Sequence, residues 1–173
     1  LDALASNMLE ARPTIMTAVP RLYETLYARI SRGVAKSGAL RRFLFAKTLE
    51  LGRKRFEAPK SLGLGARLLD VVLDRLVRDK VRARFGGRLK ALVSGGAPLN
   101  PEIGMFFTAL GLRILQGYGQ TEVNLVLGNC STLMEVRPGS MGRPIPGHVV
   151  DVLDGAGQPV PPGEIGEVAV RGP

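Results

Sequence analysis

Six consecutive residues, 117–122, place three different chemical groups close together in the chain. Tyr118 provides an aromatic ring that could stack on a base, and Gly117 and Gly119 would leave that ring exposed. Thr121 provides a hydroxyl for a phosphate oxygen. Glu122 provides a hard carboxylate oxygen, which Mg²⁺ binds alongside substrate phosphates. These residue types suggest a nucleotide and metal site, although their spacing alone does not establish one.

A second segment, residues 94–98, has the sequence Ser-Gly-Gly-Ala-Pro. Because Gly95 and Gly96 lack Cβ atoms, a flat ligand or a phosphate could approach their backbone amides. The segment matches neither a Walker A loop nor the GxGxxG pattern, so neither of those mechanisms is implied. A tight turn without a ligand explains these residues equally well.

Both segments follow predicted strands. Apolar, β-branched runs predict strands at residues 14–19, 89–94 and 112–116, with helices between them at 21–27, 39–56, 64–85 and 101–110. Strands that alternate with helices indicate an α/β fold, a parallel sheet with helices on both faces. Ligands of such sheets lie beyond the carboxyl ends of the strands, which is where both segments lie.

The helix predicted at residues 64–85 reads as amphipathic. Its predicted buried stripe is apolar and comprises Leu69, Val72, Leu73, Leu76 and Val77. Its predicted solvent side is charged and comprises Asp70, Asp74, Arg75, Arg78 and Arg82. Asp74 is expected to pair with Arg78 one turn further on.

The composition changes at Arg137, after which Gly and Pro are frequent. Short strands are predicted at residues 148–153 and 164–171, with a turn at 154–158 between them. The chain is therefore expected to comprise a partial α/β subdomain, residues 1–136, and the beginning of a small β-subdomain, residues 137–173.

Residues 116–122 resemble the Y-G-x-T-E motif of the adenylate-forming, AMP-binding superfamily, which includes the acyl-CoA synthetases. Residues 94–99 are similar to the adenine loop of that family. Two more blocks, at 139–144 and 162–167, resemble further family motifs in the expected order. The segments at 11–24 and 76–89 resemble the long-chain fatty-acid branch, so the resemblance covers nearly the whole chain.

The resemblance implies a ligase that activates a fatty acid with ATP, through an acyl-adenylate, and transfers it to coenzyme A. The implied cofactors and substrates are ATP, Mg²⁺, coenzyme A and the fatty acid. Tyr118 would stack on adenine, Thr121 would contact the α-phosphate, and Glu122 would hold Mg²⁺. The other implied site residues are small and would line or open the pocket: Gly95, Gly96, Ala97, Gly117 and Gly119.

The resemblance also implies that other parts of such an enzyme lie outside these 173 residues. A phosphate-binding loop is expected before Leu1, and a ribose-binding Asp, a hinge and a C-terminal domain with a catalytic Lys after Pro173. The chain is therefore expected to be an internal fragment with negligible turnover on its own. A nucleotide- or acyl-binding module without catalysis, and an aryl or medium-chain ligase, are the alternative interpretations.

The charge is unevenly distributed. The net charge is +9, and residues 21–90 hold 19 Lys and Arg against 6 Asp and Glu. Solvated helix faces would explain this, and so would peripheral contact with a membrane through the basic helices around Arg41-Arg42 and Arg53–Arg55. Nucleic acid is not expected as a partner, because no stacking aromatics are interleaved with the basic residues.

A cytoplasmic location is expected, because Cys130 is the only cysteine. Peripheral contact with the inner face of a membrane would be compatible with that location. One cysteine cannot form an intramolecular disulfide, which favours a reducing compartment. No run approaches the ~20 apolar residues that a spanning helix needs.

Overall fold

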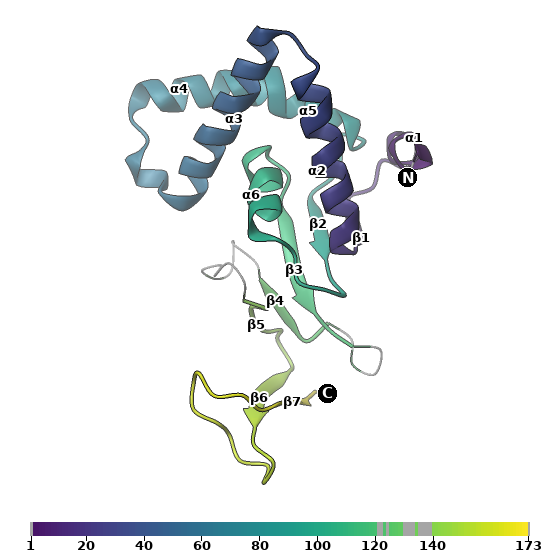
Figure 1. Ribbon diagram of the computed structural model, residues 1–173, viewed down its shortest axis with the longest axis vertical. Helices are drawn as coiled ribbons and strands as arrows, with labels where there is room; N and C mark the ends of the chain where they lie inside the picture. Colours follow the sequence, from purple (N-terminus) through teal and green to yellow (C-terminus); the bar gives the residue numbers. More distant parts are fainter. Residues whose placement is uncertain (1, 121–122, 124, 130–133, 135–139, 173) are drawn as a thin grey trace. The chain divides into compact units, whose positions relative to one another are not determined.

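A computed structural model describes residues 2–120, 123, 125–129, 134 and 140–172 of the chain (Figure 1). The chain forms two compact units, Leu1–Leu115 and Gln116–Pro173. The predicted division at residues 136/137 stays a prediction, because residues 135–139 lie outside the described part.

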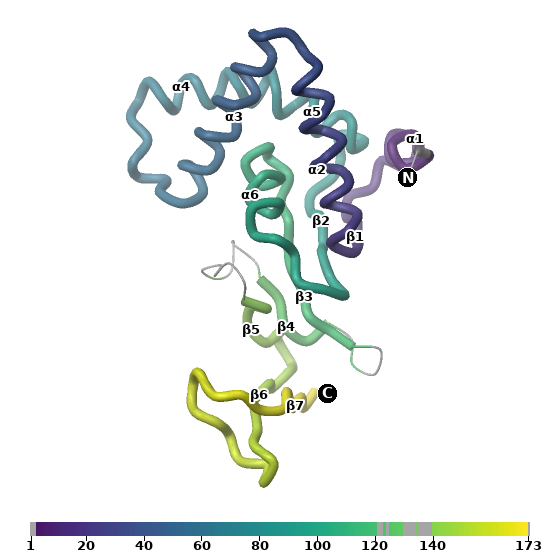
Figure 2. Tube along the Cα trace, in the orientation of Figure 1, coloured from purple at the N-terminus to yellow at the C-terminus, as the bar shows by residue number. Residues whose placement is uncertain are grey.

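The first unit is α/β, as predicted, and its chain path can be followed in Figure 2. Its strands are β1, Ile15–Ala18, β2, Ala91–Ser94, and the start of β3, Ile114–Tyr118. Its helices are α1 (Asp2–Ala11), α2 (Pro20–Ala35), α3 (Ala39–Glu57), α4 (Leu64–Leu73), α5 (Asp79–Arg84) and α6 (Pro101–Ala109). A 3₁₀ turn, Pro59–Ser61, precedes α4, and a π-helical segment, Asp74–Arg78, joins α4 to α5.

The parallel pairing predicted for the sheet is confirmed between β1 and β2. Met16 lies opposite Leu92, and Ala18 lies opposite Ser94. The Leu92 N–H donates a hydrogen bond of 2.8 Å to the carbonyl of Arg113, directly before β3. β1 and β2, which are far apart in the sequence, thus lie side by side, as parallel strands joined by helices must.

Alternate residues of β2 face the core, where Leu92 and Ser94 are both fully buried. Helix α6 supplies Phe106 and Phe107, whose rings meet edge to face with centroids 5.5 Å apart. Edge-to-face contacts of this kind add to the stabilisation from burial alone. The remaining buried members of this core are Met8, Tyr23, Phe85, Leu99, Ile103, Leu110 and Leu112.

The predicted faces of the long helix at residues 64–85 are wrong in part: Leu73 and Val77 do pack in a core, but other positions are reversed. Leu69, Val72 and Leu76 are exposed, whereas Asp70 and Arg78 are 5% and 1% exposed. Leu73 alone of the predicted apolar stripe is fully buried. The hydrophobic pattern misleads here because the polar side chains have partners in the interior, which removes most of the penalty of burying them.

Arg78 is the centre of this buried polar cluster. Its guanidinium donates hydrogen bonds to the Asp70 carboxylate at 2.7 Å, the Ala109 carbonyl at 2.8 Å and the Thr48 carbonyl at 3.2 Å. The predicted pairing with Asp74 is present at 3.6 Å. One side chain therefore connects α3, α4 and α6.

Asp74 is bound more closely by Arg82, at 2.6 Å. The hydrogen bond from Arg82 lowers the pKa of the Asp74 carboxyl below its ordinary value and raises the pKa of Arg82. Both groups therefore remain charged near neutral pH.

Gly52 of α3 permits the close approach of α3 to α6. A Cβ at Gly52 would overlap the backbone of Ala109, whose carbonyl Arg78 binds. The small residue and the buried cation thus act at the same point of the helix–helix contact.

The second unit consists of β strands. The rest of β3 pairs antiparallel with β4, Leu127–Asn129, and β4 pairs antiparallel with β5, Arg143–Pro144. The separate pair of β6, Val149–Leu153, and β7, Glu167–Arg171, agrees with the predicted strands. The predicted turn between them is capped by Asp154, whose Oδ1 accepts hydrogen bonds from the backbone N–H groups of Ala156 and Gln158.

We predict that replacing Asp70 with Asn destabilises the first unit by about 3–5 kcal/mol, because Arg78 would lose its closest buried counter-charge. The measurement is urea unfolding followed by circular dichroism. The double variant Asp70→Leu/Arg78→Met should recover part of the loss. As a control, Glu50→Gln removes an exposed carboxylate bound by Lys47 and Lys54 and should leave the midpoint nearly unchanged. An equal effect of Asp70→Asn and Glu50→Gln would contradict the assignment.

Candidate functional site

The Ser-Gly-Gly-Ala-Pro segment leaves the carboxyl end of β2, as predicted. The N–H of Gly95 donates a hydrogen bond of 3.2 Å to the Ala18 carbonyl at the end of β1. Gly96 has φ of +82°, which a residue with a Cβ adopts only with strain. The conformation of this loop therefore depends on a glycine at position 96.

Ser94 begins this loop and has an unusual environment. Its side chain is fully buried, and its hydroxyl has no hydrogen-bond partner among the residues that the structure describes. Ala97 and Pro98 are exposed. The loop thus begins with a buried hydroxyl and continues with small, exposed residues.

Tyr23 on α2 holds the strand that leads into the loop. Its hydroxyl donates a hydrogen bond of 2.9 Å to the carbonyl of Val93, the residue before Ser94. Its ring lies edge-on to Phe107 with centroids 5.9 Å apart. Burial raises the pKa of Tyr23 to about 12, so the hydroxyl remains a donor at neutral pH.

The helix that follows the loop is anchored separately. The side chain of Asn100 accepts a hydrogen bond of 2.9 Å from the N–H of Glu102, so the predicted N-cap is confirmed. Pro101 is the first residue of α6, also as predicted. Tyr23 thus contacts both the strand before the loop and the helix after it.

Sequence reasoning did not identify Tyr23 as a site residue. Tyr23 and Val93 are 70 positions apart, and no local pattern connects them. A fully buried tyrosine does need a partner for its hydroxyl, but the partner becomes known only from the tertiary structure.

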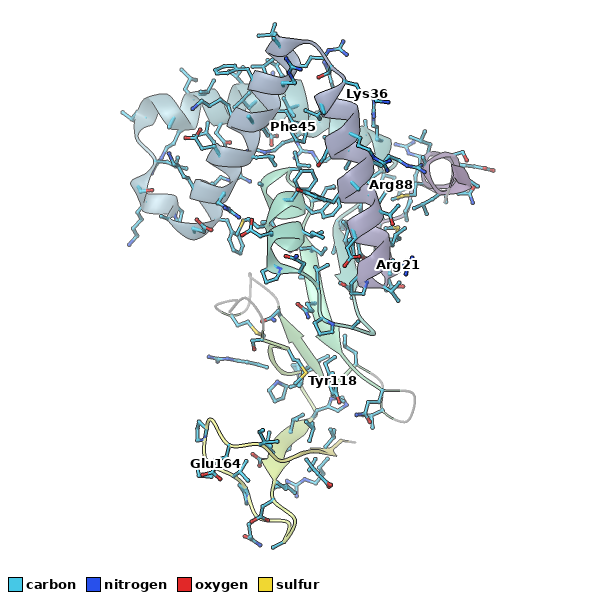
Figure 3. The ribbon with its side chains drawn as sticks, in the orientation of Figure 1. Arg21, Lys36, Phe45, Arg88, Tyr118 and Glu164 are labelled. Carbon is cyan, nitrogen blue, oxygen red and sulfur yellow. The ribbon has the colours of Figure 1, made fainter. Side chains whose placement is uncertain are left out.

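The second predicted segment lies in the second unit, and Tyr118 is the last residue of β3 (Figure 3). Tyr118 is half-buried. The side-chain amide of Gln120 donates a hydrogen bond of 2.6 Å to its hydroxyl. Gly117 lies against Leu125, and a Cβ at position 117 would overlap the Leu125 side chain. Gly119, like Gly117, is partly accessible.

Thr121 and Glu122, predicted to contact the α-phosphate and Mg²⁺, lie outside the described residues. Among the residues that are described, no group of three or more His, Cys, Asp or Glu side chains could hold a metal ion. A metal held by Glu122 and substrate phosphates would not need such a group, since Mg²⁺ is often bound by one or two carboxylates.

The block at residues 139–144 contains a second position that requires glycine. Gly142 has φ of +98°, and a Cβ there would overlap the carbonyl of Gly128 on β4. The N–H of Gly142 donates to the Ser140 hydroxyl at 3.0 Å. This motif is therefore explained by close packing of β4 and β5, without invoking a ligand.

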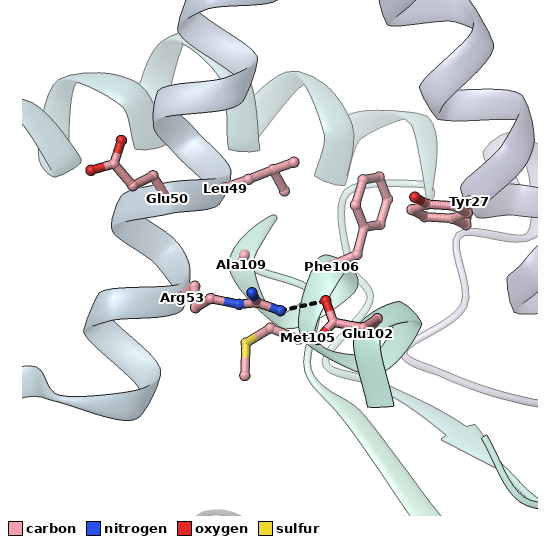
Figure 4. Close-up of a pocket in the computed structure, with 8 residues that line it drawn as sticks. All are labelled: Tyr27, Leu49, Glu50, Arg53, Glu102, Met105, Phe106 and Ala109. Carbon is pink, nitrogen blue, oxygen red and sulfur yellow. Dashed lines mark hydrogen bonds and ion pairs between the residues drawn. The ribbon is translucent and has the colours of Figure 1, made fainter. Parts of the chain in front are cut away.

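A shallow pocket lies among α2, α3 and α6 of the first unit (Figure 4). Its volume is about 390 Å³, and Tyr27, Leu49 and Phe106 form apolar parts of its lining. An ion pair of 2.5 Å between Arg53 and Glu102 spans one side. None of the predicted site residues lines this pocket.

The family assignment follows from comparison with known proteins. The family of AMP-binding enzymes matches residues 1–173. The chain belongs to this family. Long chain acyl-CoA synthetase 6, peroxisomal, of Arabidopsis thaliana is 35% identical over 98% of the chain, which covers 24% of that protein. A long-chain-fatty-acid–CoA ligase of Mycobacterium tuberculosis is 33% identical over 93% of the chain and 25% of its own length. The chain thus spans about a quarter of the curated relatives it matches.

Solved structures of adenylate-forming enzymes share the fold. A benzoate CoA ligase from Burkholderia xenovorans has a TM-score of 0.59 and 28% identity, over 99% of the chain and 25% of that protein. MatB from Rhodopseudomonas palustris has a TM-score of 0.57 at 23% identity, over 99% and 24% respectively, which supports the fold alone. The family predicted from the motifs is confirmed.

We predict that Tyr23→Phe loosens the loop at residues 94–98 with a stability loss of only about 1 kcal/mol, because one hydrogen bond is removed and the ring contact remains. Backbone hydrogen exchange should become faster at residues 93–96. The control is Tyr27→Phe, whose hydroxyl makes no hydrogen bond in the described structure and whose ring contact with Phe106 is retained. Unchanged exchange in Tyr23→Phe would show that the hydroxyl does not hold the loop.

Proposed function

We propose that the chain is the middle part of an ATP-dependent long-chain fatty-acid–CoA ligase. The observation that supports this most directly is the match to long-chain relatives over 98% of the chain. A mitochondrial acyl-coenzyme A synthetase of Rattus norvegicus is 41% identical to the chain, but the match covers only 56% of the chain. The long-chain relatives therefore account for more of this sequence.

The proposed reaction has two steps. The fatty-acid carboxylate attacks the α-phosphate of ATP, forming acyl-adenylate and releasing pyrophosphate. The thiol of coenzyme A then attacks the acyl carbonyl, forming the thioester and releasing AMP. In such reactions a protein contributes mainly by aligning the reactants and by stabilising the charge that develops on the phosphate.

Each proposed site residue has one role in this reaction. The ring of Tyr118 stacks on adenine, and the Thr121 hydroxyl contacts the α-phosphate. Glu122 holds Mg²⁺, which when bound neutralises phosphate charge. Gly95, Gly96 and Ala97 line the boundary of the adenine and acyl sites. The geometry of the first loop supports this part of the proposal, because its small residues are accessible and its backbone is fixed by Tyr23.

Two alternatives are tested by the same experiments. One is a nucleotide- or acyl-binding module without catalysis, and the other is a ligase for aryl or medium-chain acids. The observation that supports the alternative ligase is the structural likeness to a benzoate CoA ligase at 28% identity. A nucleotide-binding module and the alternative ligase both retain nucleotide recognition, so these two differ in turnover and acid preference rather than in ATP binding. An acyl-binding module does not require ATP binding.

A cytoplasmic location and peripheral membrane contact are also proposals. None of the helices in the described part of the chain is long and apolar enough to span a bilayer. The basic segment Arg53–Arg55, predicted to contact lipid, is largely neutralised: Arg53 pairs with Glu102, Lys54 with Glu50, and Arg55 with Asp70. Membrane contact through that segment is therefore weakly supported.

We predict that these 173 residues alone release pyrophosphate from Mg·ATP and a C16 fatty acid at a negligible rate. The parts that the family resemblance places outside the chain supply most of the charge stabilisation at the α-phosphate. The measurement is coupled pyrophosphate detection, with the full-length protein as the positive control. Turnover of the chain near the full-length rate would refute the proposal that it is a part of the catalytic unit.

We predict that Glu122→Gln in the full-length protein lowers kcat/KM for the fatty acid by about 10²-fold or more, as expected when one transition-state contact is lost. ATP affinity, measured by calorimetry, should change much less. The matched control is Glu164→Gln, an exposed carboxylate of the second unit. A full-length protein that binds ATP but shows no turnover with C8, C16 or benzoic acids would instead support the binding module.

A further inference from the structure

Helix α4 carries apolar side chains on two opposite sides. On its inner side, Leu73 and Ala66 pack with Leu51 and Leu62 in a small core. On its outer side, five apolar side chains are exposed, which we call the outer stripe: Leu64, Leu68, Val71, Val72 and, in the adjoining π-helical segment, Leu76.

The outer stripe is a continuous surface rather than a set of scattered residues. Leu64, Leu68 and Val71 are 85%, 70% and 60% exposed. Their spacing of four and three residues places them on one face of the helix. Single exposed apolar residues are ordinary, but contiguous apolar surface indicates a site of interaction.

The charges beside the outer stripe are positive and uncompensated. Arg67 and Arg75 are exposed, and neither forms an ion pair within the described residues. The neighbouring carboxylates are already engaged: Asp70 is buried with Arg78, and Asp74 pairs with Arg82. The face that α4 offers to solvent is therefore apolar and cationic.

We propose that the outer stripe of α4 binds the surface of an anionic lipid bilayer. Leucine and valine side chains would enter the boundary between headgroups and acyl chains, as on interfacial amphipathic helices. The long side chains of Arg67 and Arg75 would extend to the lipid phosphates. This surface differs from the basic segment that the sequence suggested, and the proposal does not depend on ligase activity.

The position of the stripe can be tested with a fluorophore. In the full-length protein, without other cysteines, Leu68→Cys is labelled with an NBD dye and mixed with vesicles of phosphatidylcholine and phosphatidylglycerol. We expect a blue-shifted emission that doxyl-labelled lipids quench, and no change for the control Ile165→Cys, in the second unit. A water-like emission at position 68 with saturating vesicles would overturn the proposal.

The contribution of the side chains can be tested by co-sedimentation with the same vesicles. Leu64→Ser/Leu68→Ser should reduce partitioning by about ten-fold or more, since binding scales with buried apolar area. The control Val149→Ser/Ile165→Ser removes two exposed apolar side chains of the second unit and should have little effect. If the serine variant does not fold, the fluorophore test and the charge test still show whether α4 binds the bilayer.

The charge test compares Arg67→Glu with Lys36→Glu, which change the net charge equally. Lys36 is an exposed cation at the end of α2. Binding through α4 predicts a loss of several-fold only for Arg67→Glu, and a weakening of binding with rising salt. Equal losses in both variants would indicate general attraction and would overturn the proposal.

Two other occupants of the outer stripe give different results. If another part of the full-length protein covers it, iodide will not quench the dye at position 68 even without vesicles. If a second copy covers it, sedimentation will show a dimer that Leu64→Ser/Leu68→Ser abolishes. Either result would overturn the lipid assignment.

Discussion

The arrangement of the first unit depends on the buried guanidinium of Arg78. A cation with 1% exposure is tolerable only if nearly all of its donors are bound, and here the Asp70 carboxylate and three backbone carbonyls bind them. Those acceptors belong to α3, α4 and α6. The geometry of one ion pair and its hydrogen bonds therefore fixes where three helices lie.

This constraint extends to the loop at residues 94–98 through α6. The end of α6 is held by Arg78 at Ala109, and its beginning is capped by Asn100. The strand before the loop is held by Tyr23. The loop itself contains small residues with little packing of their own, so its conformation is determined by these anchors. Such preorganisation from a supporting layer is what a nucleotide site requires, because mobile contacts would lose binding free energy when they become ordered.

The outer side of α4 follows from the same constraint. Asp70 and Arg78 lie on the inner side because they satisfy one another there, and Leu64, Leu68 and Val71 consequently face solvent. The hydrophobic pattern predicted the opposite orientation for Leu69, Val72 and Leu76. Periodicity alone cannot distinguish the two faces when a buried ion pair competes with an apolar stripe, and the π-helical segment at Asp74–Arg78 further shifts the register.

The α/β class, the positions of β1, β2 and α6, and the family could be predicted from the residues, because strand patterns, helix caps such as Asn100-Pro101, and short motifs are all local. The buried side of α4 and the side chain that supports the loop could be recognised only in the folded chain. Tyr23 and Val93, like Arg78 and Ala109, are distant in the chain, and each pair contributes only when both partners have been brought together. Contacts of that kind have no local signature, since their free energy depends on burial and on partners that the fold supplies.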